Sequence, residues 1–249
     1  MPDVVADGPA GSSPAGVPPM RVVMLAFPRM TQLDLTGPFE VFTRFKELTV
    51  DLVWKTAEPV SDASGLRLVP SKTFADCPQA DILFVPGGPG QMGLMEDQET
   101  LDFLRDQAEG ATWITSVCTG SLVLAAAGLL AGYRATCHWS SIDQLALFGV
   151  EPVHQRVVVD RNRVTGAGVT SGIDFGLTLT AMLFGEERAR RAQLGMEYDP
   201  APPFAGGTPS SAPAETVRAV TEAMKPFIAE RMAISKRAAE VLARRGAGE

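Results

Sequence analysis

The chain has few of the residues that mark several classes of protein, and each shortage excludes a class. Its 249 residues include only three cysteines and two histidines. Cys77, Cys118 and Cys137 are odd in number and widely spaced, so they do not form the framework of a disulfide-rich protein. They indicate free thiols in a reducing cytoplasm. No cluster of cysteine and histidine has the spacing of a zinc site.

Positive charge and long apolar runs are also scarce. Lysine and arginine number 22 against 29 aspartates and glutamates, which gives a formal net charge of −7. An acidic chain has no general attraction to nucleic acid or to anionic membranes. No apolar run approaches the roughly 20 residues that cross a bilayer. Residues 1–19 lack the basic and apolar regions of a secretory signal, and their Pro, Gly, Ala and Ser content predicts a disordered leader.

The most informative segment that is present is residues 111–130, ATWITSVCTGSLVLAAAGLL. Its β-branched and aromatic beginning, residues 112–115, predicts a short buried strand. Its leucine- and alanine-rich end, residues 121–130, predicts a buried helix. Between them, residues 116–120 place Cys118 two positions from a small residue on either side. This is the spacing of a nucleophile elbow with cysteine as the nucleophile.

The elbow would place Cys118 at the N-terminus of a helix. The helix dipole and the free N–H groups there favour a thiolate, the reactive form of cysteine. The alternative is a buried structural cysteine, since free cysteines are often buried. The strand, elbow and helix together favour the nucleophile.

Strands and helices alternate along the rest of the chain, which predicts a three-layer α/β sandwich with a largely parallel sheet. The domain covers residues 20–199. Residues 200–249 form a Pro-rich connector and a C-terminal helix, in which Pro226 should kink or interrupt the helix. This extension packs on its own domain or on a partner. The further strands are predicted at 21–27, 49–54, 81–85, 157–160 and 163–166, and the further helices at about 39–45, 98–109, 140–148, 173–184 and 186–195.

An open parallel sheet places its active site at the carboxyl ends of its strands. Asp34 is predicted in the loop after the first strand, where its carboxylate could meet Cys118 or could simply belong to a turn. The turn at residues 86–90 follows another strand. The N–H of Gly88 could stabilise negative charge there, as in an oxyanion hole, or the turn could be a plain connection. His138 could orient the thiol or a water, but a satisfied core or interface histidine is slightly preferred.

These segments resemble the ThiJ/PfpI superfamily over about residues 21–195. The resemblance rests on Asp34-Leu35-Thr36-Gly37-Pro38, Pro86-Gly87-Gly88 and Val117-Cys118-Thr119-Gly120. Further stretches are similar to the isonitrile-hydrating members of that superfamily. They lie at residues 115–124, 127–130, 136–139, 201–204 and 212–213.

The resemblance implies a flavodoxin-like fold of the class I glutamine amidotransferase type, a homodimer and no cofactor. It implies a hydro-lyase that adds water to a small isonitrile and releases an N-substituted formamide. Cys118 would be the nucleophile and form a thioimidate, Asp34 the acid–base carboxylate, and Thr119 a site residue beside the thiol. The N–H groups of Gly88 and Thr119 would stabilise the developing charge.

Two departures and two alternatives accompany this interpretation. Thr119 stands where the superfamily's proteases carry histidine, and Asp34 stands where its deglycases and chaperones usually carry glutamate. One alternative is another cysteine enzyme of this fold, such as a glyoxalase-like hydratase. The other is a ligand-sensing domain like those of AraC-type regulators. The acidic balance and the missing helix-turn-helix segment argue against the second.

Overall fold

Within residues 18–246, which are the residues that this computed structural model describes, one sheet of seven strands runs through the molecule. Its spatial order is β10-β11-β7-β6-β1-β2-β5. All neighbours run parallel except β10 and β11, which form an antiparallel hairpin at one edge. Residues 1–17 of the predicted leader lie outside the described residues. The strands are β1 (Met20–Leu25), β2 (Leu48–Trp54), β5 (Lys72–Thr73), β6 (Ile82–Val85), β7 (Trp113–Val117), β10 (Val157–Asp160) and β11 (Arg163–Gly166).

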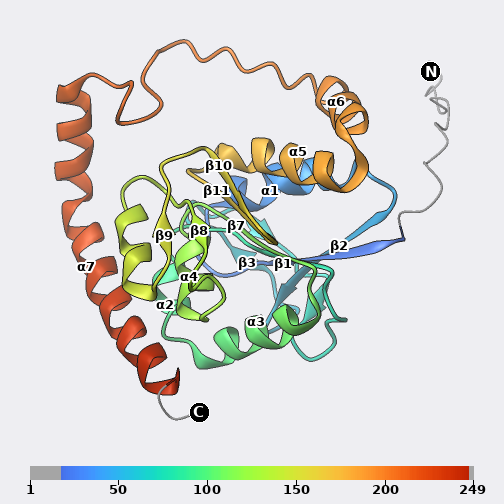
Figure 1. Cartoon of the computed structure of the whole chain (residues 1–249), viewed down its shortest axis with the longest axis horizontal. Coiled ribbons are helices and arrows are strands. Elements are labelled where there is room, and N and C mark those ends of the chain that lie inside the picture. The colour runs from blue at the N-terminus through green and yellow to red at the C-terminus, as the bar shows by residue number, and fades with distance from the viewer. Residues whose placement is uncertain (1–17, 247–249) are drawn as a thin grey trace.

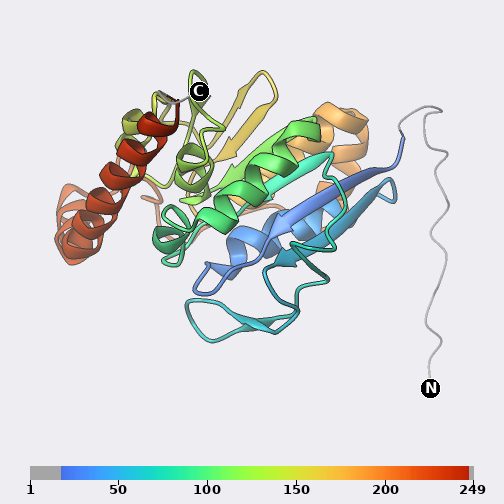
Figure 2. The same ribbon diagram turned by 90° about the horizontal axis from the view of Figure 1, so that it is seen from below.

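Helices cover both faces of the sheet (Figure 2), so the predicted three-layer sandwich is confirmed. One layer contains α1 (Gln32–Phe42) and α5 (Ser171–Phe184), with α6 (Glu186–Gly195) packed on α5. The other layer contains α3 (Gln98–Gly110) and α4 (Gly120–Ala126). The smaller elements are β3 (Val60–Ser61), β4 (Arg67–Leu68), β8 (Arg134–Ala135), β9 (Glu151–Pro152), α2 (Gln91–Leu94) and the 3₁₀ helix η1 (Ile142–Phe148).

Buried apolar side chains join these layers. Residues 22–27 are fully buried, as their continuous apolar sequence predicts for a central parallel strand. Phe175 of α5 contacts Phe42 of α1 and Phe84 of β6, with ring centroids 6.1 and 5.5 Å apart. Aromatic side chains bury large apolar areas, so this cluster fixes α1 and α5 on one face of the sheet. The placement of α1 matters for the site because its first turn carries Asp34.

Two helix boundaries differ from the prediction. The helix after β1 begins at Gln32 and not near residue 39, so Asp34 lies in a helix and not in a loop. Pro38 is tolerated inside α1, where it packs against α5 at Gly172. The helix after the elbow ends at Ala126 and not at residue 130. Gly128 adopts a φ of +83°, a left-handed conformation that ends helices.

The C-terminal helix α7 (Ala214–Gly246) is continuous through Pro226, so the predicted interruption is wrong. Pro226 is exposed, and solvent can therefore satisfy the carbonyl group that loses its helical partner. The helix runs along one side of the molecule and is joined to α6 by the long connector (Figure 1). None of the helices within residues 18–246 is long and apolar enough to cross a membrane.

The C-terminal half of α7 packs on α2, α4 and η1. Its buried residues are Arg231, Ser235 and Ala238, whose spacing puts them on one helix face. The apolar residues that the sequence indicates as contacts are at most partly buried, and Val220 is 41% exposed. These residues are Val220, Met224, Phe227, Ile228 and Met232.

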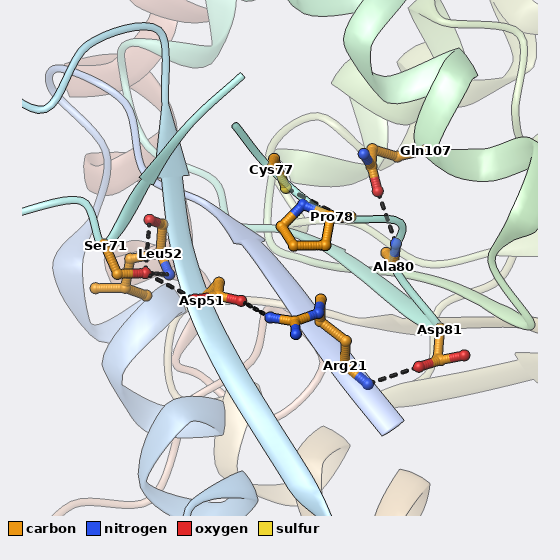
Figure 3. A network of polar contacts seen from close by, with 9 residues as sticks. All are labelled: Arg21, Asp51, Leu52, Ser71, Cys77, Pro78, Ala80, Asp81 and Gln107. Carbon is orange, nitrogen blue, oxygen red and sulfur yellow. Dashed lines mark hydrogen bonds and ion pairs between the residues drawn. The ribbon is translucent and has the colours of Figure 1, made fainter. Parts of the chain in front are cut away.

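A polar network joins the amino ends of β1 and β6 (Figure 3). The elbow lies at the opposite, carboxyl end of the strands. The Arg21 N–H donates to Asp81 Oδ2 at 2.7 Å, and the Arg21 guanidinium pairs with Asp51. Cys77 lies in this region, and its thiol contacts the carbonyl oxygen of Pro78 at 3.3 Å. Burial, together with the nearby Asp51 carboxylate, raises the pKa of Cys77 to about 11. Cys77 is remote from the candidate site because it precedes the amino end of β6, whereas the elbow follows the carboxyl end of β7.

Candidate active site

The turn between β7 and α4 has the geometry of a nucleophile elbow. Cys118 adopts a φ of 58°, in the left-handed region that side-chain-bearing residues rarely adopt. Its N–H donates to the carbonyl oxygen of Gly166 at 3.0 Å, which fixes the strained residue. A Cβ atom on Gly120 would lie 2.1 Å from the carbonyl oxygen of Val85. The small residue after the nucleophile is therefore required by the approach of two backbone segments.

We expect Gly120→Ala to destabilise the protein by about 3 kcal/mol, because the added methyl group must separate the elbow from the end of β6. Thermal unfolding measures this loss. Gly195→Ala is the matched control, since a Cβ atom there meets nothing within 4 Å. An unchanged melting temperature for Gly120→Ala would show that the elbow relaxes freely around the new side chain.

Asp34 reaches the elbow from the first turn of α1 and is completely buried. Its Oδ2 accepts a hydrogen bond from the Gly87 N–H at 2.9 Å. The Cys118 thiol lies close enough to the Asp34 carboxyl to lower its pKa. Asp34 Oδ1 has no partner with good hydrogen-bond geometry among residues 18–246. The structure thus brings together the two residues that the sequence selects as acid–base group and nucleophile.

Thr119 and Gly88 complete the inner part of the site, in an arrangement that the sequence does not predict. The Gly88 N–H donates to Thr119 Oγ1 at 3.0 Å, so it is engaged within the protein and does not face the thiol freely. The Thr119 N–H lies near the Cys118 sulfur and lowers the pKa of its thiol. A Cβ atom on Gly87 would lie 2.5 Å from the Thr119 nitrogen and 2.8 Å from Asp34 Oδ2. Gly87 therefore allows these groups to converge.

The resting thiol is not the thiolate that a helix N-terminus favours. Cys118 is only 4% exposed, and burial raises the pKa of its thiol well above the usual range. The Asp34 carboxylate and Cys137 raise this pKa further, while the Thr119 N–H lowers it. Loss of hydration outweighs the helix N-terminus because a buried anion has few water contacts. Cys118 is therefore a neutral thiol at rest.

The pKa of Asp34 is raised to about 7. Burial is the main cause, and the hydrogen bonds from Cys118 and Gly87 act in the opposite direction. A carboxyl group of this kind exchanges its proton near neutral pH, as an acid–base catalyst must. Asp34 and Cys118 interact directly, so their protons are lost as a pair.

Cys137 and His138 are buried or half-buried near the elbow. Burial raises the pKa of Cys137 to about 12. His138 Nδ1 lies 2.8 Å from Ser140 Oγ, and burial lowers the His138 pKa, as does the charge of Arg231. This local partner favours the interpretation of His138 as a satisfied histidine. No group of three His, Cys, Asp or Glu side chains in residues 18–246 could hold a metal ion.

Sequence reasoning missed three buried polar side chains beside α4. They are Gln91 of α2, Ser141 before η1, and Arg231 of α7. A signal for Arg231 was present in the sequence. It follows Phe227 by four residues, so it lies on the helix face that carries the predicted apolar contacts. An arginine on a helix face that is expected to pack against the domain indicates that its positive charge is buried.

A model of the DJ-1/PfpI family matches residues 20–182, and the chain belongs to this family. The isonitrile hydratase of Pseudomonas putida is 50% identical over 223 residues, which are 90% of this chain and 98% of that enzyme. A crystal structure of a THiJ/PfpI family protein from Pseudomonas syringae has a TM-score of 0.87 at 45% identity, covering 92% of this chain and 97% of that one. The glutathione-independent glyoxalase DJR-1.2 of Caenorhabditis elegans is 32% identical over 53% of this chain and 72% of the glyoxalase. The predicted superfamily is thus confirmed.

Proposed function

We propose that this protein is an isonitrile hydratase, a hydro-lyase that adds water to isonitriles and releases N-substituted formamides. The observation that carries the proposal is a buried Cys118–Asp34 pair in a chain that is 50% identical to an isonitrile hydratase over nearly its whole length. An isonitrile accepts a nucleophile at its terminal carbon only if the adduct is protonated. The pair supplies a nucleophile and a proton donor at one place.

The first half of the reaction forms a thioimidate. The proton of the Cys118 thiol moves to Asp34, and the thiolate attacks the terminal carbon of R–N≡C, forming a carbon–sulfur bond. Asp34 delivers the proton to the same carbon, which gives R–N=CH–S–Cys118. Asp34 Oδ1 is suited to this transfer because Oδ2 is held by the Gly87 N–H.

The second half consumes water. Asp34, now a carboxylate, takes a proton from a water molecule as its oxygen adds to the thioimidate carbon. The nitrogen receives that proton, which gives the tetrahedral species R–NH–CH(OH)–S–Cys118. Its hydroxyl proton passes to Asp34 while the carbon–sulfur bond breaks, and R–NH–CHO leaves. The Thr119 N–H and hydroxyl, the latter oriented by the Gly88 N–H, stabilise the charge that develops in these steps.

The experiment that tests the function is a formamide-formation assay with a panel of aliphatic and aromatic isonitriles. Turnover of at least one isonitrile is the expected result, with methylglyoxal as the comparison substrate. Conversion of methylglyoxal and of no isonitrile would assign the site to a glyoxalase-like enzyme. A protein that converts neither and shifts a DNA fragment on a gel would be a regulator domain.

We expect kcat/KM to rise about tenfold per pH unit up to about pH 7 and then to level off. Below the pKa of Asp34, which is about 7, both members of the pair hold their protons and no nucleophile is available. Above it the pair holds one proton, which can lie on Asp34 while Cys118 attacks. Initial rates at fixed ionic strength measure the profile. A rate that does not change between about pH 5.5 and 8.5 would contradict the shared-proton mechanism.

The enzyme is a homodimer. Support comes from the first half of α7, where apolar side chains remain partly exposed and need a cover. A second copy can provide that cover with the same face of its own helix. Sedimentation at low micromolar concentration should give a species of twice 26.4 kDa. A clean monomer would contradict the dimer. The side chains concerned are Val220, Met224, Phe227 and Ile228.

The enzyme works in the cytoplasm, on a small-molecule substrate and without a cofactor. The three cysteines are free, which supports a reducing compartment. Residues 20–199 are the catalytic domain, and residues 200–249 are an extension whose helix lies over α4. Recovery of the native protein from a secreted fraction would contradict this location.

A further inference from the structure

Arg231 is a buried cation that the proposed mechanism does not use. It lies on the packed face of α7 and is only 3% exposed. Among residues 18–246, no carboxylate lies within ion-pairing distance of its guanidinium group. A buried charge without an opposite charge is costly, because the protein replaces its hydration poorly. Such a residue calls for an explanation beyond packing.

The partners that hold Arg231 are all neutral. Its Nη1 donates to Ser141 Oγ, and its Nε lies 3.0 Å from the side-chain oxygen of Gln91 in the orientation that satisfies that amide. The ring of Phe227 lies 4.4 Å from the guanidinium carbon. These contacts fix the direction of the side chain from three sides. They leave its positive charge uncompensated.

The same contacts place this charge beside the elbow. α7 packs on α4, which begins directly after the nucleophile turn, and on η1. The Ser141 N–H donates to the carbonyl oxygen of His138 at 2.9 Å, and Cys137 is the residue before. Burial lowers the pKa of Arg231, whereas the sulfurs of Cys137 and Cys118 raise it. Both sulfurs therefore lie within reach of this positive charge. Cys137 interacts with it more strongly than Cys118 does, and the charge in turn lowers the pKa of Cys137.

We propose that Arg231 is a positioning residue of the site, a fixed positive charge that the C-terminal helix contributes to stabilise negative charge on the Cys118–Asp34 pair. The inference deepens the proposed function but concerns the reactivity of Cys118 itself. Arg231 acts through the field at the sulfur and not by contact with a reacting atom. When the pair loses its first proton, the resulting anion is buried, and the nearby guanidinium offsets the lost hydration.

The test follows the pH dependence of Cys118 alkylation by iodoacetamide in the full-length protein. The groups that face Cys118 electrostatically are Asp34 and Cys137, with Arg231 acting from α7. Mass spectrometry of the Cys118 peptide gives the rate, and Cys77, at the opposite edge of the sheet, is the internal standard. In Arg231→Met the pH at which Cys118 alkylation reaches half its maximal rate should rise by about one unit. At a fixed pH below that midpoint, alkylation should be about tenfold slower than in the wild type.

Arg231→Lys keeps the charge and should restore most of the wild-type profile. Arg237→Met is the matched control, because Arg237 lies on the same helix but is exposed and pairs with Glu96 at 2.7 Å. Its profile should equal the wild type. If Arg231→Met does not fold, Arg231→Gln, which keeps a hydrogen-bonding group for Ser141, replaces it in the comparison.

A folded neutral variant with the wild-type midpoint overturns the proposal, as does an Arg231→Lys variant that behaves like the neutral one. Alkylation requires no isonitrile. A failure of the isonitrile assay therefore leaves this result intact, and an unchanged alkylation profile leaves the proposed function intact.

Discussion

Alanine in place of Cys118 is expected to reduce formamide formation to the uncatalysed rate. In the proposed mechanism the elbow supplies the sulfur that forms the carbon–sulfur bond, and no other thiol occupies that turn. Cys118→Ser should be equally inactive, because a serine hydroxyl needs a strong base that this site does not provide. Formamide release with a saturating isonitrile measures the effect. Thermal unfolding should confirm that both variants fold.

Cys77→Ser is the control for this prediction, because Cys77 lies at the amino edge of the sheet, and it should keep near-native activity. Cys137→Ser should also remain active, since Cys137 is not in the elbow. It is a weaker control, because Cys137 is buried and influences the Cys118 thiol. Substantial turnover by clean Cys118→Ala protein would remove the covalent mechanism.

Asp34→Asn is expected to lower kcat by about two to four orders of magnitude. The amide can still accept the hydrogen bond from Gly87, so the shape of the first turn of α1 is kept. It cannot hold a proton and release it to the substrate carbon. Steady-state kinetics across the pH range measure the loss, and the rise of kcat/KM through about pH 7 should disappear with it.

Stability offers an independent readout of the same substitution. The folded-state pKa of Asp34 is raised, so ionisation of this group disfavours the folded state. The penalty is absent below the unfolded value near 4, grows with pH, and is complete above about 7. Asp34→Asn should therefore raise the melting temperature relative to wild type at pH 8 more than at pH 4.

Asp106→Asn is the matched control for Asp34→Asn, because Asp106 is an exposed aspartate on α3. It should change neither the rate nor the pH dependence of stability. Near-native activity of Asp34→Asn at every pH would reduce Asp34 to a residue that only shapes the turn.

The sequence was sufficient to locate the elbow and the order of the layers, because both depend on local patterns. A β-branched strand, a cysteine between small residues and an apolar helix can be recognised within twenty residues. The position of Asp34 was right and its local structure wrong. Thr36, Gly37 and Pro38 are typical of a helix start, yet α1 begins at Gln32 and includes all three, and Gly37 lies against Ile173 of α5.

The protonation state of the site was beyond the reach of sequence reasoning. A helix N-terminus is a local feature and predicts a thiolate, whereas the burial that keeps Cys118 neutral comes from the packing of the whole domain. The same applies to the Gly88 N–H, whose partner is a side chain 31 residues away. The burial of Arg231, which lies more than 110 residues after Cys118, depends on the packing of α7.

Because α7 is the last helix of the chain, its packing on α4 can form only late in synthesis. A ribosome releases the chain from its N-terminus, so the strands, α1 and the elbow can assemble while the last helix is still in the exit tunnel. Until α7 docks, α2, α4 and η1 lack the cover that it provides. The elbow that carries Cys118, the proposed nucleophile, can therefore form before its surroundings are complete. A nascent chain interrupted within the connector would hold Cys118 without the cover that α7 provides.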